Sequence, residues 1–124
     1  MIAVDTSSLV AYLGGEEGVD VELVDQAFEF GQAVLPPVVL TEVLSAPGLE
    51  ARIAGTIREL PVLETLPGFW TRAAEVRSRI LEKGLRARLA DTLISQSCLD
   101  HETPLITRDR DFRHFAEHAG LRLA

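Results

Sequence analysis

The segment MIAVDTSSLVAYL (residues 1–13) sets the fold class of this chain. Its first five residues form a short apolar run that ends in the charge of Asp5. From Thr6 onward the apolar residues recur at the spacing of one helix face, with Leu9 and Leu13 four positions apart. The pattern predicts a strand that passes directly into a helix, with a carboxylate at the junction.

The same alternation of strand and helix continues to the end of the chain. Further short apolar runs predict strands at 33–37, 61–66, 104–107 and 121–124. Stretches with helical spacing predict helices at 16–30, 37–46, 49–60, 68–84, 88–101 and 111–120. No tight hairpin signal joins neighbouring strands, so we expect parallel pairing and helices on both faces of the sheet. The expected fold class is an α/β sandwich.

Length and composition indicate one globular domain. The chain has 124 residues, of which 47% are hydrophobic and 25% charged, so residues 1–124 are expected to form a single domain. The only cysteine, Cys98, excludes an internal disulfide. The N-terminus lacks the basic start of a secretion signal, and no stretch approaches the roughly 20 apolar residues that cross a bilayer. We therefore expect a cytoplasmic protein with no membrane partner.

Charge is distributed unevenly along the chain. The formal net charge of −7 taken alone argues against a nucleic-acid partner. However, residues 1–64 carry eleven acids and two arginines, whereas residues 65–124 carry eight acids and ten basic residues. An anion would therefore dock on the second half, and most of the positive charge of that half lies within 68–88. A solvated helix face explains such a run equally well.

Two carboxylates follow strands of the expected parallel sheet. Asp5 ends the first apolar run, and Asp109 comes shortly after the run at 104–107. Ligands of open α/β sheets bind outside the carboxyl ends of the strands, so both residues are candidates for a functional site. An aspartate in such a position is also a common N-cap of the next helix.

Two further carboxylates stand on helices where a solvated side chain is not expected. On a helical projection Asp91 lies close to the line of Ile94 and Cys98, and Glu42 projects near Val38 and neighbouring apolar residues. Carboxylates are seldom buried without a partner. Each of the two therefore belongs either to a site or to an ion pair with an arginine.

Four converging carboxylates repel one another unless a cation lies among them. Oxygen ligands of this kind select Mg²⁺ or Mn²⁺, which also bind phosphate oxygens. The expected chemistry is metal-assisted hydrolysis of a phosphodiester, in which the metal activates water and neutralises the scissile phosphate. A negatively charged chain can accept a negatively charged substrate in this way.

The segments DTSSLVAYL (5–13), LTEVL (40–44) and LADTLISQSCLDHETPLITRDRDF (89–112) resemble those of PIN-domain ribonucleases of the VapC type. These ribonucleases are the toxin half of toxin-antitoxin pairs, and the resemblance covers essentially the whole chain. It implies a PIN-like three-layer sandwich, with a central parallel sheet and helices on both faces. The chain departs from the pattern at Ser95 and Ser97, where many relatives have alanines.

The resemblance also implies the roles of individual residues. Four acids match the catalytic site of the family: Asp5, Glu42, Asp91 and Asp109. The three aspartates among them correspond to the ligands of Mg²⁺ or Mn²⁺, and the glutamate acts through water. Asp111 is close enough in sequence to share the role of the last aspartate.

Five further residues are expected to support that site or its substrate. Thr107 and either Thr6 or Ser7 match hydroxyl positions that bond the carboxylates or the substrate, although a helix cap explains Thr6 and Ser7 equally well. Arg108 and Arg110 are expected to meet phosphate or to hold the acids, and a turn with surface ion pairs is the alternative.

The resemblance implies a metal-dependent endoribonuclease whose partners are an RNA substrate, a cognate antitoxin protein and a second copy of the chain in a homodimer. The alternative is a PIN-like module that binds RNA or protein without cutting. A phosphatase of the haloacid-dehalogenase type is disfavoured, because it needs a second aspartate where Ser7 stands.

Overall fold

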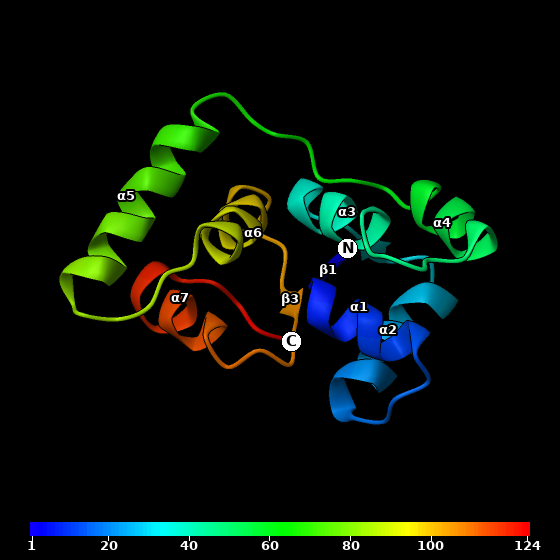
Figure 1. Cartoon of the computed structure of the whole chain (residues 1–124). Coiled ribbons are helices and arrows are strands. Elements are labelled where there is room, and N and C mark those ends of the chain that lie inside the picture. The colour runs from blue at the N-terminus through cyan, green and yellow to red at the C-terminus, as the bar shows by residue number, and fades with distance from the viewer.

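A computed structural model describes all of residues 1–124 and shows a parallel sheet surrounded by helices (Figure 1). The strands are β1 (Ile2–Val4), β2 (Ala33–Val34) and β3 (Leu105–Ile106). Their order is β2-β1-β3, with β1 parallel to both neighbours. The strand from the N-terminus therefore lies between strands that come from the middle and the end of the chain.

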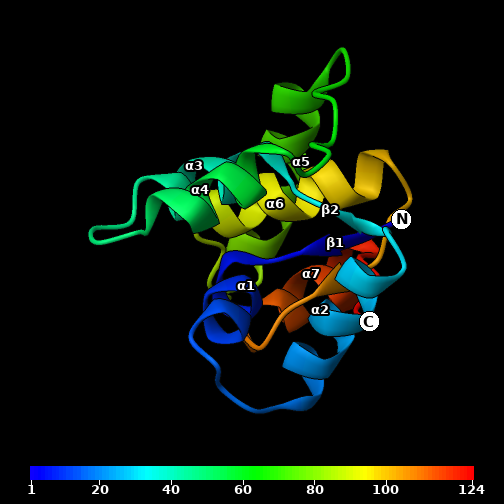
Figure 2. The same cartoon turned by 90° about the vertical axis from the view of Figure 1, so that its right-hand side faces the viewer.

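Seven helices surround the sheet, and in Figure 2 they lie on both sides of it, with α3 and α6 on one side and α1, α2 and α7 on the other. They are α1 (Thr6–Leu13), α2 (Val19–Glu29), α3 (Pro37–Leu44), α4 (Ala51–Arg58), α5 (Phe69–Glu82), α6 (Leu89–Asp100) and α7 (Phe112–Ala119). This arrangement confirms the predicted α/β sandwich. None of the helices has the length and apolar character needed to span a membrane.

The core joins the sheet to both helical layers. Ala3 and Val4 of β1 are fully buried, as are Leu105 and Ile106 of β3. Helices contribute one buried face each, and the two aromatic rings of α7, Phe112 and Phe115, are among the largest fully buried side chains. The apolar spacing that predicted the helices therefore also identifies the faces that they bury.

Two predicted strands, 61–66 and 121–124, are reduced to isolated parallel bridges. Val62 pairs with Leu35 next to β2, and Leu123 pairs with Leu105 of β3. At the first bridge, Leu35 donates to the carbonyl of Pro61 and accepts from the amide of Leu63. The neighbouring prolines lack the N–H that would extend the pairing. These segments lie where the predicted sheet would continue, but they are too short to count as strands.

Candidate functional site

The carboxylate of Asp5 is held by hydroxyl groups from two parts of the chain. Asp5 follows β1 directly, and its residue is only 4% exposed. Its Oδ2 accepts hydrogen bonds from Ser7 Oγ at 2.6 Å and from Thr107 Oγ1 at 2.8 Å. Thr107 is within reach because β3 pairs with β1, with Ile106 opposite Val4. Parallel pairing thus brings the ends of two strands together, as the sequence predicted.

The loop after β3 is organised by the same threonine. Thr107 Oγ1 accepts a hydrogen bond from the amide of Asp109 at 3.0 Å, and Asp109 Oδ1 accepts one from the amide of Asp111 at 2.9 Å. These two bonds are local Asx- and Thr-type turns, which fix the backbone that carries both aspartates. Thr107 consequently links the position of Asp109 to that of Asp5.

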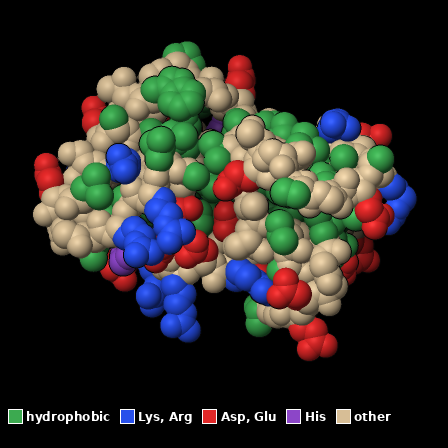
Figure 3. Space-filling view, in the orientation of Figure 1, with side chains coloured by type: hydrophobic (Ala, Val, Ile, Leu, Met, Phe, Trp, Pro, Cys, Tyr) green, Lys and Arg blue, Asp and Glu red, His purple; other side chains and the backbone are tan.

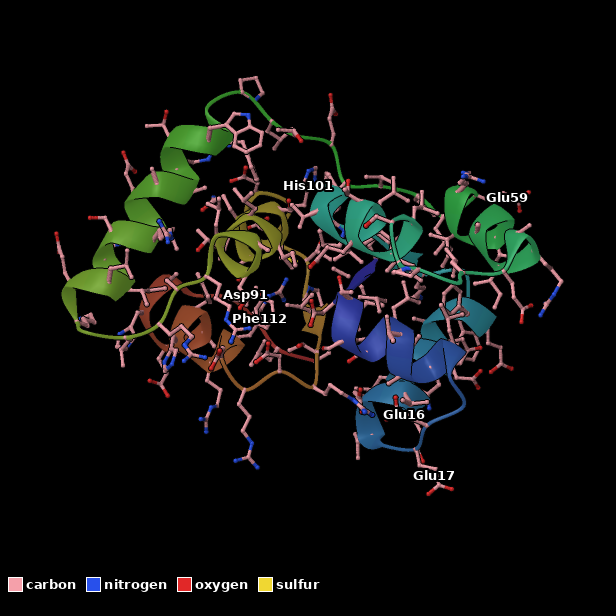
Figure 4. The ribbon with its side chains drawn as sticks, in the orientation of Figure 1. Glu16, Glu17, Glu59, Asp91, His101 and Phe112 are labelled. Carbon is pink, nitrogen blue, oxygen red and sulfur yellow. The ribbon has the colours of Figure 1, made fainter.

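Asp91 is the least satisfied carboxylate of the site. It stands in the first turn of α6, near the middle of the view in Figure 4. Its Oδ2 is buried and has no hydrogen-bond partner within the protein. Burial, followed by the negative charges of Asp109, Asp5 and Asp111, raises the pKa of Asp91 to about 6, against the opposing effect of Arg88.

Three carboxylates meet closely enough to share one cation. Oxygen atoms of Asp91, Asp109 and Asp111 all lie within 4.8 Å of one another, and we call these three residues the acidic cluster. Asp5 is outside this group, although its charge acts on Asp91. The structure thus joins Asp111 to two of the three aspartates that the resemblance marks as metal ligands, and it sets Asp5 beside them.

Glu42 does not lie where its helical projection suggested. We expected it on the apolar side of its helix, but the residue is exposed. Helix α3 buries Val39 and Val43, and Glu42 is displaced by 100° from Val43, at the margin of the buried face. Its Oε1 accepts a hydrogen bond of 2.7 Å from Thr6 Oγ1, so the residue after Asp5 orients it.

Arg108 is directed away from the acidic cluster. Its Nε and Nη2 donate to the two carboxylate oxygens of Asp20 at 2.8 and 3.2 Å, and its Nη1 donates to Glu16 Oε1 at 3.2 Å. Asp20 also accepts from the buried Ser8 Oγ at 2.8 Å, and the hydrogen bond from Arg108 holds the pKa of Asp20 below its usual value. Arg108 therefore ties the loop after β3 to the start of α2.

Gly18 makes room for this ion pair. Its φ of 149° is a conformation that other residues rarely adopt. A Cβ at this position would lie 2.6 Å from Asp20 Oδ1 and 3.1 Å from Arg108 Nη2. A side chain here would thus strain the backbone and crowd both partners of the ion pair.

Arg110 has no salt-bridge partner and is exposed, although it stands between Asp109 and Asp111 in the sequence. Arg86, which precedes α6, approaches the acidic cluster instead, with its Nη1 at 3.7 Å from Asp111 Oδ2. Sequence reasoning did not single out Arg86, Ser8 or Asp20. Only the general excess of arginines within 68–88 pointed towards the first of them.

The acidic cluster suits a hard divalent cation. Each of its three residues offers a carboxylate oxygen, and the unpartnered Oδ2 of Asp91 is a buried acceptor that no protein donor satisfies. Carboxylates are ligands that Mg²⁺ and Mn²⁺ prefer. A cation here would also offset the burial and the repulsion that together raise the pKa of Asp91. The donor set therefore fits the group that the sequence led us to expect.

Residues 2–118 match the family model described as PIN domain. The chain belongs to the PIN domain family. A comparison with curated proteins gave no match. The PIN assignment agrees with the parallel sheet, with helices on both faces, and with aspartates at the ends of β1 and β3.

Solved structures share this PIN fold over nearly the whole chain. A chain of VapBC2 from Rickettsia felis, bound to a DNA fragment from its promoter, is 17% identical with a TM-score of 0.78, and the match covers 100% of this chain and 98% of that one. A chain of VapBC from Salmonella typhimurium, bound to DNA, is 16% identical with a TM-score of 0.71, and the match covers 100% of this chain and 98% of that one. A chain of VapBC-5 from Mycobacterium tuberculosis is 21% identical with a TM-score of 0.66, and the match covers 98% of this chain and 95% of that one. At these identities the likeness shows a common fold.

Proposed function

We propose that this PIN domain is a metal-dependent endoribonuclease and the toxin of a toxin-antitoxin pair. The observation that carries the proposal is the meeting of Asp91, Asp109 and Asp111 within 4.8 Å, beside a fourth acid, Asp5. The similarity to chains of several VapBC complexes supports a cognate antitoxin as partner. We further propose that the chain acts in the cytoplasm and as a homodimer.

The acids have different roles in this proposal. Asp91, Asp109 and Asp111 would hold Mg²⁺ or Mn²⁺, and Asp5, fixed by Ser7 and Thr107, would complete the negative surroundings from the end of β1. Such a cation supplies a Lewis acid for the scissile phosphate and lowers the pKa of a bound water. Glu42, exposed and oriented by Thr6, would act through water, as its match to the glutamate of the family implies.

The test is cleavage of labelled RNA by the purified protein, freed of any antitoxin, with Mg²⁺, with Mn²⁺ and with a chelator. Loss of a residue that only supports a metal ligand typically costs roughly 10 to 100-fold in affinity or activity, so Asp91→Asn is expected to cost at least that much. The matched control is Glu59→Gln, which removes one negative charge from an exposed residue at the end of α4 (Figure 4). It is expected to cleave like the wild type.

Cleavage that requires the metal and disappears only in Asp91→Asn would support the nuclease and its site. Cleavage that survives this substitution would place the chemistry elsewhere. If no RNA is cut under any condition, the alternative of a PIN module that binds RNA or protein without cutting gains the support that the nuclease loses.

A further inference from the structure

Most arginines of the second half of the chain fall into two groups, and Arg79 and Arg122 belong to neither. Some are used within the fold: Arg72 makes a bidentate pair with Asp100 at 2.6 and 2.9 Å, Arg77 donates to the carbonyl of Ala87 at 2.9 Å, and Arg108 binds Asp20 and Glu16. Their charge is satisfied by the protein or directed away from the acidic cluster. These arginines therefore leave little free positive charge next to the acidic cluster.

A second group surrounds the acidic cluster and stays free. We call this group the arginine rim, and it consists of Arg86, Arg88, Arg110 and Arg113. All four are exposed, and three of them take part in no salt bridge. The exception is Arg86, whose side chain is 61% exposed and whose contact with Asp111 is long, at 3.7 Å. Such a surface pair contributes little to stability.

Two members of the rim act on the acids directly, and the other two lie close to them along the chain. Arg86 reaches Asp111, and Arg88 lies close enough to Asp91 to oppose the rise of its pKa. Arg110 stands between two residues of the acidic cluster, and Arg113 donates to the carbonyl of Arg110 at 3.2 Å. In Figure 3, Lys and Arg side chains gather beside acidic ones on the side of the molecule where α5 and α7 lie.

The opposite side of the site carries the other charge. Helices α5, α6 and α7 contact one another and form one side of the molecule, whereas α1 to α4 form the other (Figure 1). The latter derive from residues 1–64, which hold eleven acids against two arginines, both on α4. A polyanion that reaches the acidic cluster is therefore attracted from one side and repelled from the other.

We propose that the arginine rim is the docking surface for the phosphate backbone of the RNA, so that the strand enters over the α5–α6 loop and the start of α7. This inference rests on the nuclease function proposed above. Exposed guanidinium groups bind phosphate oxygens through paired N–H donors, and they need no particular base sequence to do so. The rim holds the substrate, and the cluster beside it carries the chemistry.

The test compares double variants that each remove two positive charges. Arg110→Gln/Arg113→Gln and Arg86→Gln/Arg88→Gln remove halves of the rim, and Arg52→Gln/Arg58→Gln is the matched control on α4, where both arginines are exposed. Binding of a labelled single-stranded oligoribonucleotide is followed by fluorescence anisotropy at several salt concentrations, in the Asp91→Asn background with Mg²⁺. Cleavage by the same double variants is followed in the active background.

Each rim pair is expected to weaken binding roughly tenfold and to lower the slope of log affinity against log salt by roughly 1.4, because each lost phosphate contact on a single strand contributes about 0.7. For Arg110→Gln/Arg113→Gln the KM for cleavage should rise while kcat stays close to the wild-type value. The α4 control should change neither quantity.

Unchanged affinity and salt slope in both rim variants, with cleavage intact, would overturn the docking surface and leave the nuclease standing. Loss of binding in the rim variants without cleavage by the active background would support the surface and count against the nuclease. Displacement of the RNA by a polyglutamate peptide that itself binds more tightly to the rim would assign the surface to an acidic protein segment and overturn the proposal.

Discussion

Asp5 and Asp91 are neighbouring carboxylates of one site, yet the protein treats them in opposite ways. Asp5 is almost completely buried, and its Oδ2 accepts two short hydrogen bonds from hydroxyl groups. Asp91 is half-buried, its Oδ2 accepts none, and its pKa is raised to about 6. The strand end therefore carries a carboxylate whose charge is already stabilised, whereas α6 carries one that lacks a partner.

This difference separates the two tasks of the site. The hydroxyls around Asp5 fix its orientation before any ligand arrives, which is the role of supporting hydrogen bonds around a metal centre. Burial and the neighbouring carboxylates both disfavour the charged form of Asp91, and a bound cation would stabilise that form. We infer that the hydrogen bonds of Asp5 at the end of β1 fix the geometry of the site. The unpartnered Asp91 on α6 favours the binding of a cation.

The largest effect on cleavage is expected from Thr107→Val, which removes the hydroxyl that supports Asp5 at the end of β1. The substitution removes the donor to Asp5 and the acceptor for the amide of Asp109 while nearly preserving the shape of the side chain. Since such supporting groups typically contribute roughly 10 to 100-fold, cleavage should fall by that factor. Steady-state cleavage at saturating Mg²⁺ measures it, and circular dichroism checks the fold.

Two companion variants make this result specific. Thr107→Ser keeps the hydroxyl and should restore most of the activity. Thr103→Val removes a buried hydroxyl that donates to the carbonyl of His101, before β3, and should leave cleavage unchanged. Equal activity of Thr107→Val and the wild type would mean that Asp5 needs no hydroxyl support. The hydrogen bonds that distinguish Asp5 from Asp91 would then have no role in cleavage.

A smaller effect is expected on the pH dependence of stability. The pKa of Asp91 is about 6 in the fold against an ordinary value of 3.8, so the native state holds this proton to a higher pH than the unfolded state does. The contribution of Asp91 to the free energy of unfolding should therefore fall as the pH rises from 3.8 to about 6, and the full cost remains above that range. Because solvent screens a half-exposed group, the cost is on the order of 1 kcal/mol.

Denaturant unfolding of the wild type and Asp91→Asn without metal measures this cost. The variant should be the more stable protein at pH 7, and the advantage should vanish below pH 4. The difference between the two proteins removes the contribution of Asp20, whose pKa is shifted in the opposite direction. Added Mg²⁺ should stabilise only the wild type. A wild type that matches or exceeds the variant at pH 7 without metal would show that Asp91 is not strained.

The sequence predicted these features to unequal degrees. The order of strands and helices followed from local spacing, and Asp5 and Asp109 were proposed as site residues because parallel strands end at a common edge. The prediction that Glu42 lies on the apolar side of its helix was wrong, because one position on a helix separates a buried face from its margin. Asp20 could not be identified as the partner of Arg108, since the two are 88 residues apart and many other acids were equally available. Pairwise contacts of this kind depend on tertiary packing.

The smallest effect concerns an unpartnered hydroxyl on α6. Three hydroxyl residues lie on this helix, and Thr92 and Ser97 donate to the carbonyls of Arg88 and Leu93, respectively. Ser95 is fully buried and has no partner, and it stands one helical turn from Asp91. Helix α6 therefore holds three unpartnered buried oxygens, those of Asp91, Ser95 and Gln96, whereas the hydroxyls around Asp5 are all engaged.

Ser95→Ala should consequently be neutral or stabilising by about 0.5 kcal/mol, because it removes a buried group that makes no hydrogen bond. Ser97→Ala gains the same helix propensity but loses a bond, so it should be the less stable of the two by about 1 kcal/mol. Thermal unfolding of both variants without metal gives the comparison. If Ser95→Ala proves the less stable, or weakens the binding of Mg²⁺, then its hydroxyl has a partner in solution, and α6 is as firmly organised as the strand end.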